Sequence, residues 1–416
     1  MIIGQFTESY PPTIDGVGGV VHNYCKEMTL RGHRCVFIGP DNKKVEAPQD
    51  YELMLYRSIK PSSKVPYRVG FPQMLPGFKS EIREIPFDVV HAHTPFMAGW
   101  YAREVARERG IPLVATFHSK YYDDIYRATR SKFLSRKVVD RIVRFYESCD
   151  EVWTVNERTA MVLKEYGYRG SIVVMQNGID PTEERTLGDI SDLNLREDVP
   201  QLLFVGQQDY KKGTRQLMDA CGILHEEGFP FQLVMVGEGQ DQMALAKQAG
   251  ALGIGDDVIF TGRIMDRARL MAIYKNAELF VFPSVYDNAP LVVREAALAG
   301  TPSLVVTGSC AAEGMEDRVN GFLCDGTAED IARKIKEALP DAERVGREAH
   351  RTIPVTWNKI GGYIEERYRN LVERKEAEQA AENAEDAKET PAEAPAEGEE
   401  GAPEEGTESA PEEKEE

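Results

Sequence analysis

The chain has 416 residues, which is too long for one ordinary hydrophobic core and predicts two domains with additional segments. Its formal charge of −19 is unevenly distributed, because residues 376 to 416 hold 17 acidic and 2 basic residues and leave only −4 for the rest. We expect no nucleic-acid partner for a chain of this charge.

The acidic C-terminal segment is rich in Glu, Ala, Pro and Gly and has no aromatic residue. Because such a segment cannot bury enough apolar surface to order itself, we expect residues 376 to 416 to be disordered. A role in solubility is the simplest interpretation, and binding of a partner is the alternative.

Cysteine usage and the first residues indicate a cytoplasmic protein. The six cysteines are scattered without a C-x-x-C pair, as is typical of small core residues in a reducing compartment. The chain starts directly in an apolar segment, without a signal-peptide pattern. No run of about 18 apolar residues is present, so no membrane-spanning helix is expected.

Short apolar segments alternate with helical patterns throughout the first half, which predicts a parallel sheet covered on both faces. The first helical pattern ends at Gly32, as a C-cap would. The predicted strands are Ile2–Phe6, Cys35–Ile38, Val89–Ala92, Leu113–Phe117, Glu151–Val155 and Ile172–Met175.

The second half restarts at Leu202–Val205 and repeats the alternation to about Pro354. We therefore predict two Rossmann-like α/β domains, residues 1–176 and 177–355, with a ligand cleft at the C-terminal ends of their strands. Residues 356–375 are predicted to form a last helix, with Trp357, Ile360, Ile364, Tyr368 and Leu371 at helical spacing.

Three histidines lie at strand ends of the first half. His118 closes the strand Leu113–Phe117, and a strand's C-terminal end favours a functional role over a structural one. His91 and His93 flank another strand end but lack a third ligand at suitable spacing, so we predict no metal site.

A basic amphipathic pattern occupies the region from Arg127 to Arg144, with seven basic residues and one acid. On a helical wheel its apolar residues, Leu134 among them, gather on one half, and Arg136, Lys137, Arg141 and Arg144 gather on the other. We expect a helix near residues 131 to 147, and a basic amphipathic helix can lie on an anionic membrane. The alternative is a surface helix whose apolar half packs on the sheet.

The segment from Leu279 to Ser303 combines a buried-strand pattern with two acids. Leu279–Phe282 has the length of a parallel strand, and Pro290 suits the first turn of a following helix. That helix carries Glu295, eight residues after Asp287. A carboxylate beyond a strand end, with helix N–H groups beside it, suits a ligand with vicinal hydroxyls and an anionic group, such as a nucleotide-sugar.

This segment resembles the E-x7-E signature of the retaining GT-B glycosyltransferases of family 4, with Asp287 in place of the first Glu. The resemblance extends over about residues 1 to 370 and implies a GT-B fold whose terminal helix crosses back onto the first domain. It rests on segments in the family's order: Tyr10–Gly19, Asn177–Asp180, Phe204–Gly213, Gly237–Gly239, Val258–Ile264, Gly308–Glu313 and Asn320–Leu323.

The resemblance also implies roles for individual residues. Glu295 would hold the ribose, Lys212 the diphosphate, His118 would face the transferred sugar, and Gly16 would approach the donor phosphate, with Gly18 and Gly19 as rivals. The predicted catalytic set is His118, Lys212, Asp287 and Glu295. The predicted donor site further includes Gly206, Gln207, Gly237, Gly262, Arg263, Ile264, Asn288, Ala289, Pro290 and Leu291.

One position departs from the family in a way that affects phosphate binding. Gln207 stands where the family usually has Arg, and an amide donates hydrogen bonds without charge. Either Lys211 helps to neutralise the diphosphate, the donor is held differently, or the activity is weak.

The expected function is a retaining, metal-independent hexosyltransferase that uses no cofactor and takes a nucleotide-sugar donor, with UDP-hexose favoured over GDP-mannose. In this family the leaving phosphate is thought to accept the proton of the acceptor hydroxyl. Tyr10-Pro-Pro and Tyr67–Pro72 resemble segments of bacterial diacylglycerol glycosyltransferases, which favours a diacylglycerol-type or glycolipid acceptor at the inner face of the cell membrane. Alternatives are a polysaccharide or sugar-phosphate acceptor, a nucleotide-sugar epimerase, and a non-catalytic donor-binding protein.

Overall fold

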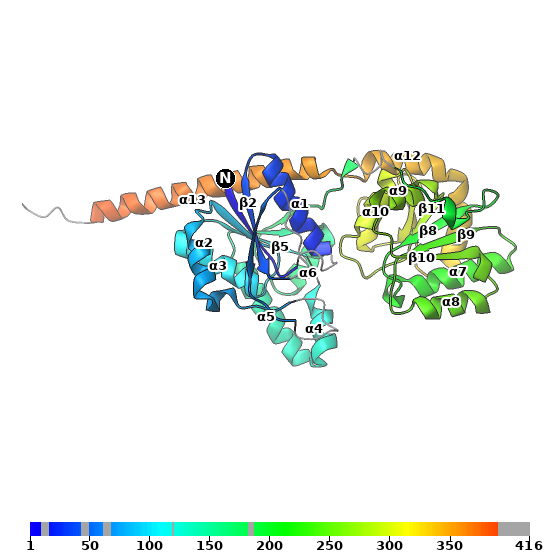
Figure 1. Cartoon of the computed structure of the whole chain (residues 1–416), viewed down its shortest axis with the longest axis horizontal. Coiled ribbons are helices and arrows are strands. Elements are labelled where there is room, and N and C mark those ends of the chain that lie inside the picture. The colour runs from blue at the N-terminus through cyan, green and yellow to red at the C-terminus, as the bar shows by residue number, and fades with distance from the viewer. Residues whose placement is uncertain (10–15, 43–49, 61–67, 119, 182–186, 390–416) are drawn as a thin grey trace, which may run out of the picture. The chain divides into compact units, whose positions relative to one another are not determined.

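In the computed structural model, the chain forms two parallel β-sheets, each covered by helices (Figure 1). The structure describes residues 1–9, 16–42, 50–60, 68–118, 120–181 and 187–389. Met1–Glu373 form one compact unit, and Arg374–Glu416 form a second. The predicted α/β architecture with two Rossmann-like sheets is confirmed.

The first sheet has seven strands in the order β3-β2-β1-β4-β5-β6-β7, all parallel. Only β3 was not predicted; it lies at the sheet edge, and three of its five residues are half-buried. The strands are Ile2–Phe6 (β1), Arg34–Pro40 (β2), Glu52–Tyr56 (β3), Val89–Ala92 (β4), Leu113–Phe117 (β5), Glu151–Thr154 (β6) and Ile172–Val174 (β7).

Helices cover both faces of this sheet. Neighbouring residues of one strand point to opposite faces, and they belong to different hydrophobic clusters. Val89 of β4 belongs to one cluster and Val90 to another, and Val114 and Ala115 of β5 divide in the same way. The helices of this half are Gly16–Leu30 (α1), Pro76–Glu84 (α2), Met97–Arg109 (α3), Tyr121–Thr129 (α4), Lys132–Glu147 (α5) and Glu157–Glu165 (α6).

The second sheet has six parallel strands in the order β10-β9-β8-β11-β12-β13. Its strands are Gln201–Val205 (β8), Gln232–Val236 (β9), Val258–Gly262 (β10), Leu279–Phe282 (β11), Ser303–Val306 (β12) and Phe322–Cys324 (β13). Its helices are Thr214–Glu226 (α7), Gln242–Ala251 (α8), Arg267–Asn276 (α9), Leu291–Leu298 (α10), Ala328–Ala338 (α11) and Ala342–Thr352 (α12).

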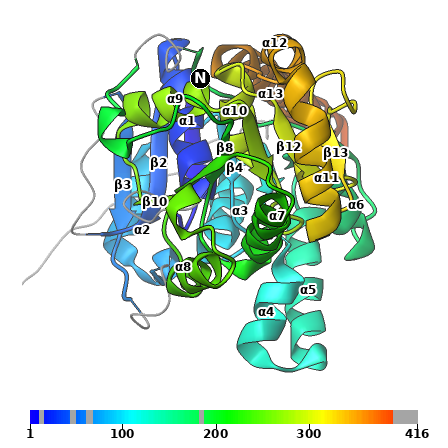
Figure 2. The same cartoon turned by 90° about the vertical axis from the view of Figure 1, so that its right-hand side faces the viewer.

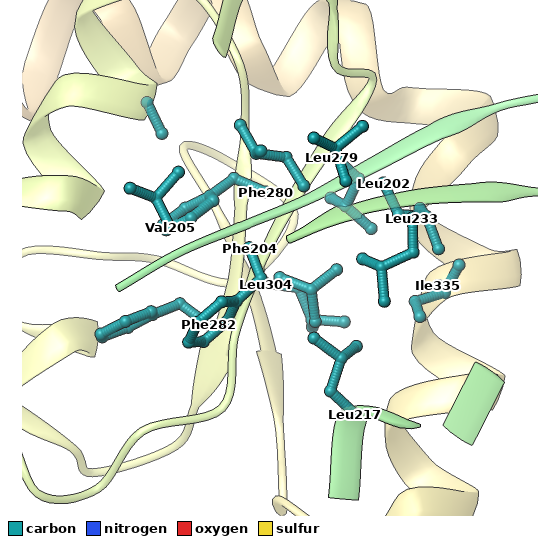
Figure 3. Close-up of a cluster of buried hydrophobic side chains, with 14 of the residues drawn as sticks. Leu202, Phe204, Val205, Leu217, Leu233, Leu279, Phe280, Phe282, Leu304 and Ile335 are labelled. Atoms are coloured by element: carbon teal, nitrogen blue, oxygen red, sulfur yellow. The ribbon is translucent and has the colours of Figure 1, made fainter. Parts of the chain in front are cut away.

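Side chains of the central strands fill the core of this second half (Figure 3). Phe204 of β8 and Phe282 of β11 stack with ring centroids 5.9 Å apart, and both side chains are buried. Truncating a buried residue of this size to Ala typically costs about 3–5 kcal/mol. This core fixes the C-terminal ends of β8 and β11, which carry the predicted donor residues.

The last helix, α13, spans Trp357–Glu389 and is longer than predicted. Its apolar residues from Trp357 to Leu371 pack with Ile3 of β1 and Val20 of α1, so the helix returns to the first half as expected. The prediction that the helix ends at 375 and that disorder begins at 376 is wrong for residues 376–389, which are helical. Ala, Glu and Lys have high helix propensity, and Pro391 is the first proline after Pro354. Residues 390–416 of the predicted tail lie outside the described residues.

The basic helix predicted near residues 131 to 147 is α5, Lys132–Glu147; the basic segment starts earlier, in α4, which lies beside α5, and both helices extend away from the first sheet (Figure 2). Arg130 separates them with a left-handed backbone (φ 54°), and the Ser131 side chain caps α5. The buried face of α5 includes Val139, Ile142 and Tyr146. Leu134 was predicted on that apolar face, yet it is 46% exposed.

Among the described residues, no helix is both long and apolar enough to cross a bilayer.

Candidate functional site

A cavity of about 500 Å³ is lined by residues from both halves of the chain. The first half contributes the start of α1, His118 at the end of β5, and the first turn of α4; the second half contributes the loops after β8 and β11. The predicted site residues in its wall are Gly16, His118, Gln207, Lys212, Asp287, Asn288, Ala289 and Leu291. Strand ends of two parallel sheets therefore face one cavity, as the sequence predicted.

Lys212 and Asp287 form an ion pair in the wall of this cavity. The Asp287 carboxylate also accepts a hydrogen bond from the Ser284 hydroxyl at 2.5 Å. The Lys212 side chain is only 12% exposed, whereas Lys211 is 33% exposed and pairs with Asp209 at 3.2 Å. Lys212 is thus the more enclosed of the two cations, and its partner is a residue that belongs to the same predicted site.

The loop from β11 leads into the first turn of α10 at the cavity, where Asn288, Ala289 and Leu291 are lining residues. Pro290 occupies the N-cap position of α10 and makes no side-chain cap, so the first-turn N–H groups of this helix have no side-chain acceptor from it. The Asn288 side chain donates to the backbone carbonyl of His118 at 3.3 Å, and the Asn288 carbonyl accepts from Asn156. These contacts tie the donor-side loop to the end of β5.

Glu295 lies on α10 with both carboxylate oxygens already bonded. Arg267 donates to Oε1 at 2.7 Å, and the Tyr274 hydroxyl donates to Oε2 at 3.0 Å. The Glu295 side chain is 11% exposed and does not line the cavity described above. Each carboxylate oxygen has a second lone pair, which leaves it able to accept a hydrogen bond from a ribose hydroxyl.

The predicted glycines of the second half bring three strand ends close together. Gly237 follows β9 with φ 123°, and a Cβ there would lie 2.0 Å from the carbonyl oxygen of Gly206. The Gly237 N–H donates to the Gly262 carbonyl at 2.8 Å. Only glycine allows this approach at Gly237. Gly206, Gly237, Gly262, Arg263, Ile264 and Pro290 do not line the cavity, so their donor-binding roles stay predictions.

His118 belongs to a buried cluster with His91 and His93. Its Nε2 lies 3.1 Å from His93 Nδ1, and burial lowers the pKa of His118 to about 3. Burial also lowers the pKa of the other two histidines well below the ordinary value. All three imidazoles are therefore neutral at physiological pH, and His118 can act as a hydrogen-bonding group but not as a cation.

Gly16 opens helix α1 and does not sit in a loop as predicted, and Gly18 and Gly19 follow within its first turn. A Cβ added at Gly16 would meet nothing within 4 Å, so the surrounding protein leaves room for a side chain and does not itself require glycine at this position. Residues 10–15 of the predicted glycine-rich loop and Tyr67 of the other lipid-enzyme segment lie outside the described residues.

Tyr286 is a cavity residue that the sequence did not single out. Lys211 and Lys212 lie 4.9 Å and 5.5 Å from its ring centroid, and its hydroxyl donates to Asp124 of α4 at 3.2 Å. Arg127 of α4 also lies over the ring, at 5.4 Å. The sequence feature that pointed to Tyr286 was its position as a lone aromatic residue in the loop that carries Asp287. Lys120, Asp123, Asp124 and Asn177 also line the cavity and were not predicted.

The predicted membrane residues lie on α5 and do not line this cavity. Arg136, Lys137 and Arg144 are exposed, and Arg141 stacks over Trp100 at 5.3 Å. Near the start of the helix, Phe133 is 71% exposed, with Lys137 Nζ 4.7 Å from its ring centroid. The exposed surface of α5 is therefore both basic and partly apolar.

Within the described ranges, no group of three or more His, Cys, Asp or Glu side chains is arranged to hold a metal ion. All six cysteines are free thiols, five of them buried and Cys149 half-buried, as predicted for core residues.

Comparison with known proteins agrees with this geometry. Residues 14–183 match the family described as Glycosyltransferase Family 4, and residues 189–353 match Glycosyl transferases group 1. The chain belongs to the GT-B glycosyltransferases. In this glycosyltransferase the first match covers the α1–β7 half, and the second covers the half that carries Lys212, Asp287 and Glu295.

Individual relatives of the glycosyltransferase differ in their named substrates. It is 27% identical to the alpha-monoglucosyldiacylglycerol synthase of Streptococcus pneumoniae, over 82% of this chain and 78% of the relative. It is 24% identical to the GDP-mannose-dependent alpha-mannosyltransferase of Corynebacterium glutamicum, over 82% and 79%. The structure of sucrose-phosphate synthase from Thermosynechococcus elongatus shares the fold, with a TM-score of 0.73, 20% identity, and coverage of 89% of this chain and 98% of that one.

Proposed function

We propose that this glycosyltransferase moves a hexose from a nucleotide-sugar to a membrane lipid of diacylglycerol or glycolipid type, with retention of the anomeric configuration. The observation that carries the proposal is the cavity that brings His118, Lys212 and the Asp287 loop together from two sheets. We take UDP-hexose as the donor, and the mannosyltransferase relative makes GDP-mannose its competitor.

The donor would bind with its diphosphate between Lys212 and the first turn of α10. A largely enclosed lysine and helix N–H groups without a side-chain cap both stabilise negative charge, and they do so more strongly where water is excluded. Asp287 now neutralises Lys212, so an incoming diphosphate would displace that carboxylate or share the cation with it. His118 would face the sugar across the cavity.

The chemistry proposed for this site needs no protein base. The acceptor oxygen forms a bond to the anomeric carbon on the face from which the bond to the diphosphate breaks. The acceptor hydroxyl proton passes to the leaving phosphate oxygen, and the nucleoside diphosphate departs. Lys212 and the α10 amides would stabilise the charge that develops on that phosphate, and we propose that no metal ion is required.

The lipid acceptor is supported by the surface of α5 and by the relative named as a diacylglycerol glycolipid synthase. Phe133 and Leu134 are exposed apolar residues at the start of the helix, beside Arg136 and Lys137. Apolar side chains flanked by cations fit the interfacial zone of an anionic bilayer. We propose that this surface places the enzyme on the membrane as a peripheral protein.

The test is a transfer assay with UDP-glucose, UDP-galactose and GDP-mannose against diacylglycerol in anionic vesicles, with a water-soluble glycan and a sugar phosphate as parallel acceptors. We expect a glycolipid product from a UDP-hexose, with the donor's anomeric configuration by NMR, and an unchanged rate in EDTA. Transfer to a soluble acceptor alone would replace the lipid proposal, and an inverted product or loss of activity in EDTA would overturn the mechanism.

A further inference from the structure

A series of buried polar side chains extends from His118, in the cavity wall, to helix α13. His118 Nε2 lies 3.1 Å from His93 Nδ1, and His93 Nε2 lies 2.7 Å from Gln5 Oε1. Gln5 Nε2 donates to the Tyr368 hydroxyl at 3.2 Å, and that hydroxyl lies 2.5 Å from His91 Nδ1. We call the residues His118, His93, Gln5 and Tyr368 the relay.

The fold places the relay in the interior of the first half. Gln5 of β1 pairs in register with His91 of β4, and His93 is the first residue after β4. Tyr368 comes from α13, in the part of that helix that packs on β1 and α1. Gln5, His93 and Tyr368 are fully buried and His118 is 7% exposed, so water does not compete for these hydrogen bonds.

The hydrogen-bond directions follow from the donors and acceptors available. A neutral imidazole has one N–H and one lone pair, and an amide oxygen only accepts. Because Gln5 Oε1 faces His93 Nε2, that nitrogen carries the proton and His93 Nδ1 is an acceptor. His118 Nε2 must then donate to His93 Nδ1. The lone pair of His118 is left on Nδ1, the ring nitrogen that His93 does not contact.

We propose that Gln5, His93 and Tyr368 are positioning residues that hold His118 in the Nε2–H tautomer, so that its Nδ1 accepts a hydrogen bond from a hydroxyl of the donor sugar. The inference rests on the proposed function, in which His118 faces the sugar. The Nε2–H tautomer makes His118 selective, because its Nδ1 can pair with a ligand group that donates a hydrogen bond and cannot pair with one that only accepts. Gln5, which lies on β1, fixes this tautomer through His93 and does not itself contact the ligand.

The tautomer can be measured without any substrate. Two-bond ¹H–¹⁵N correlation spectra of the ligand-free protein, labelled at histidine, distinguish Nε2–H from Nδ1–H. We expect His118 and His93 both to be Nε2–H. A His118 in the Nδ1–H form, or an equal mixture, would overturn the proposal whether or not the protein transfers sugar, so this result is separate from the proposed function.

Two buried tyrosines provide a matched pair of variants. Tyr368→Phe removes a relay hydroxyl, whereas Tyr146→Phe removes a fully buried hydroxyl that donates to the Thr116 carbonyl at 3.3 Å, outside the relay. Gln5→Met removes the acceptor for His93 at similar size. We expect Gln5→Met and Tyr368→Phe to mix the His118 tautomers, and Tyr146→Phe to leave His118 as Nε2–H.

Binding shows whether the relay acts through the sugar contact. Gln5→Met should weaken nucleotide-sugar binding about three- to tenfold, the size of one hydrogen bond between neutral groups, and leave binding of the nucleoside diphosphate unchanged. The same change in a His118→Phe background should have no further effect. Equal losses for both ligands, or equal losses in the two tyrosine variants, would mean that the relay is merely structural and would overturn the proposal.

Discussion

The two neighbouring lysines of the predicted donor site differ in their surroundings. Lys212 pairs with Asp287 in the cavity wall, whereas the more exposed Lys211 pairs with Asp209. An enclosed cation interacts more strongly with a diphosphate, because water screens it less. We therefore expect Lys212→Ala to reduce kcat about 100-fold or more, and Lys211→Ala to reduce it less than about tenfold. Equal losses in a steady-state transfer assay would contradict this assignment.

Glu295 offers a second test at the scale of one side chain. Glu295→Ala should weaken nucleotide binding, measured by calorimetry, since each charge-assisted hydrogen bond to the ribose contributes about 1.5–3 kcal/mol. Tyr274→Phe is the control, because it removes the hydrogen bond to Oε2 and keeps the carboxylate and its Arg267 partner. Unchanged affinity in Glu295→Ala would remove this residue from the donor site.

Glu8 introduces a pH dependence of stability. Its carboxylate accepts from the Ala98 N–H at 2.5 Å, and burial raises its pKa from 4.5 to about 7. Between these values the folded state holds a proton that the unfolded state has released, so the stabilisation is complete below pH 4.5 and is lost as pH rises through 7.

The matching variant is Glu8→Gln, which keeps an acceptor for Ala98 and cannot titrate. Urea unfolding from pH 4.5 to 8 should show wild type losing at most about 1.4 kcal/mol per pH unit relative to the variant below pH 7, with parallel curves above it. Parallel curves over the whole range would show that Glu8 ionises normally.

We expect the start of α5, with the exposed residues Phe133 and Leu134, to contribute to the proposed membrane binding. Phe133→Ser with Leu134→Ser should weaken binding to anionic vesicles at every salt concentration, because insertion of apolar surface is not screened. Arg136, Lys137 and Arg144 changed to Glu should weaken it mainly at low salt, since each cation contributes about 1 kcal/mol there. Vesicle co-sedimentation measures both effects.

Met243→Ser provides the matched control for the start of α5. Met243 lies on α8 and is 76% exposed, so the variant removes an equally accessible apolar side chain outside α5. An equal loss of binding in this control, or a wild-type protein that ignores anionic vesicles at low salt, would contradict the membrane role.

Helices and strands were predicted well from the sequence where a short run of apolar residues determines the local structure. Leu279–Phe282 and Leu113–Phe117 are strands with the predicted bounds, because short apolar runs between breakers form buried parallel strands. Edge strand β3 was missed even though residues 53–56 are a short apolar run like those of the predicted strands, whereas the basic helix expected near residues 131 to 147 is α5, Lys132–Glu147. The helix through 389 was missed because acidic composition outweighed helix propensity in the prediction.

The site was predictable only as far as strand ends define it. His118, Lys212 and Asp287 follow strands, so parallel topology places them at one cavity. The contacts that surround these residues were not predictable. Tyr286 and Asp124 lie 162 positions apart in the sequence, and the contact of Gln5 with Tyr368 joins the first strand to the last helix. Such contacts depend on the tertiary arrangement and leave no local pattern.

For the whole molecule, the charge of the C-terminal segment opposes the proposed membrane role. Residues 374 to 416 contain 17 acidic and 4 basic residues, a net −13 of the chain's −19. A tethered anionic segment is repelled by an anionic bilayer, over a distance of about 8 Å at physiological salt. The apolar residues of α13 that pack on the first half end at Val372, so a chain ending at Glu373 keeps them.

Deleting residues 374 to 416 should therefore leave the thermal unfolding temperature within about 2 °C of wild type, because no core residue of Met1–Glu373 is removed. The same deletion should tighten binding to anionic vesicles at low salt, and the gain should shrink as salt screens the repulsion. Neutral vesicles are the control, since they exert no such repulsion and should bind both forms alike. Equal binding of the two forms to anionic vesicles would show that the acidic segment does not oppose membrane association.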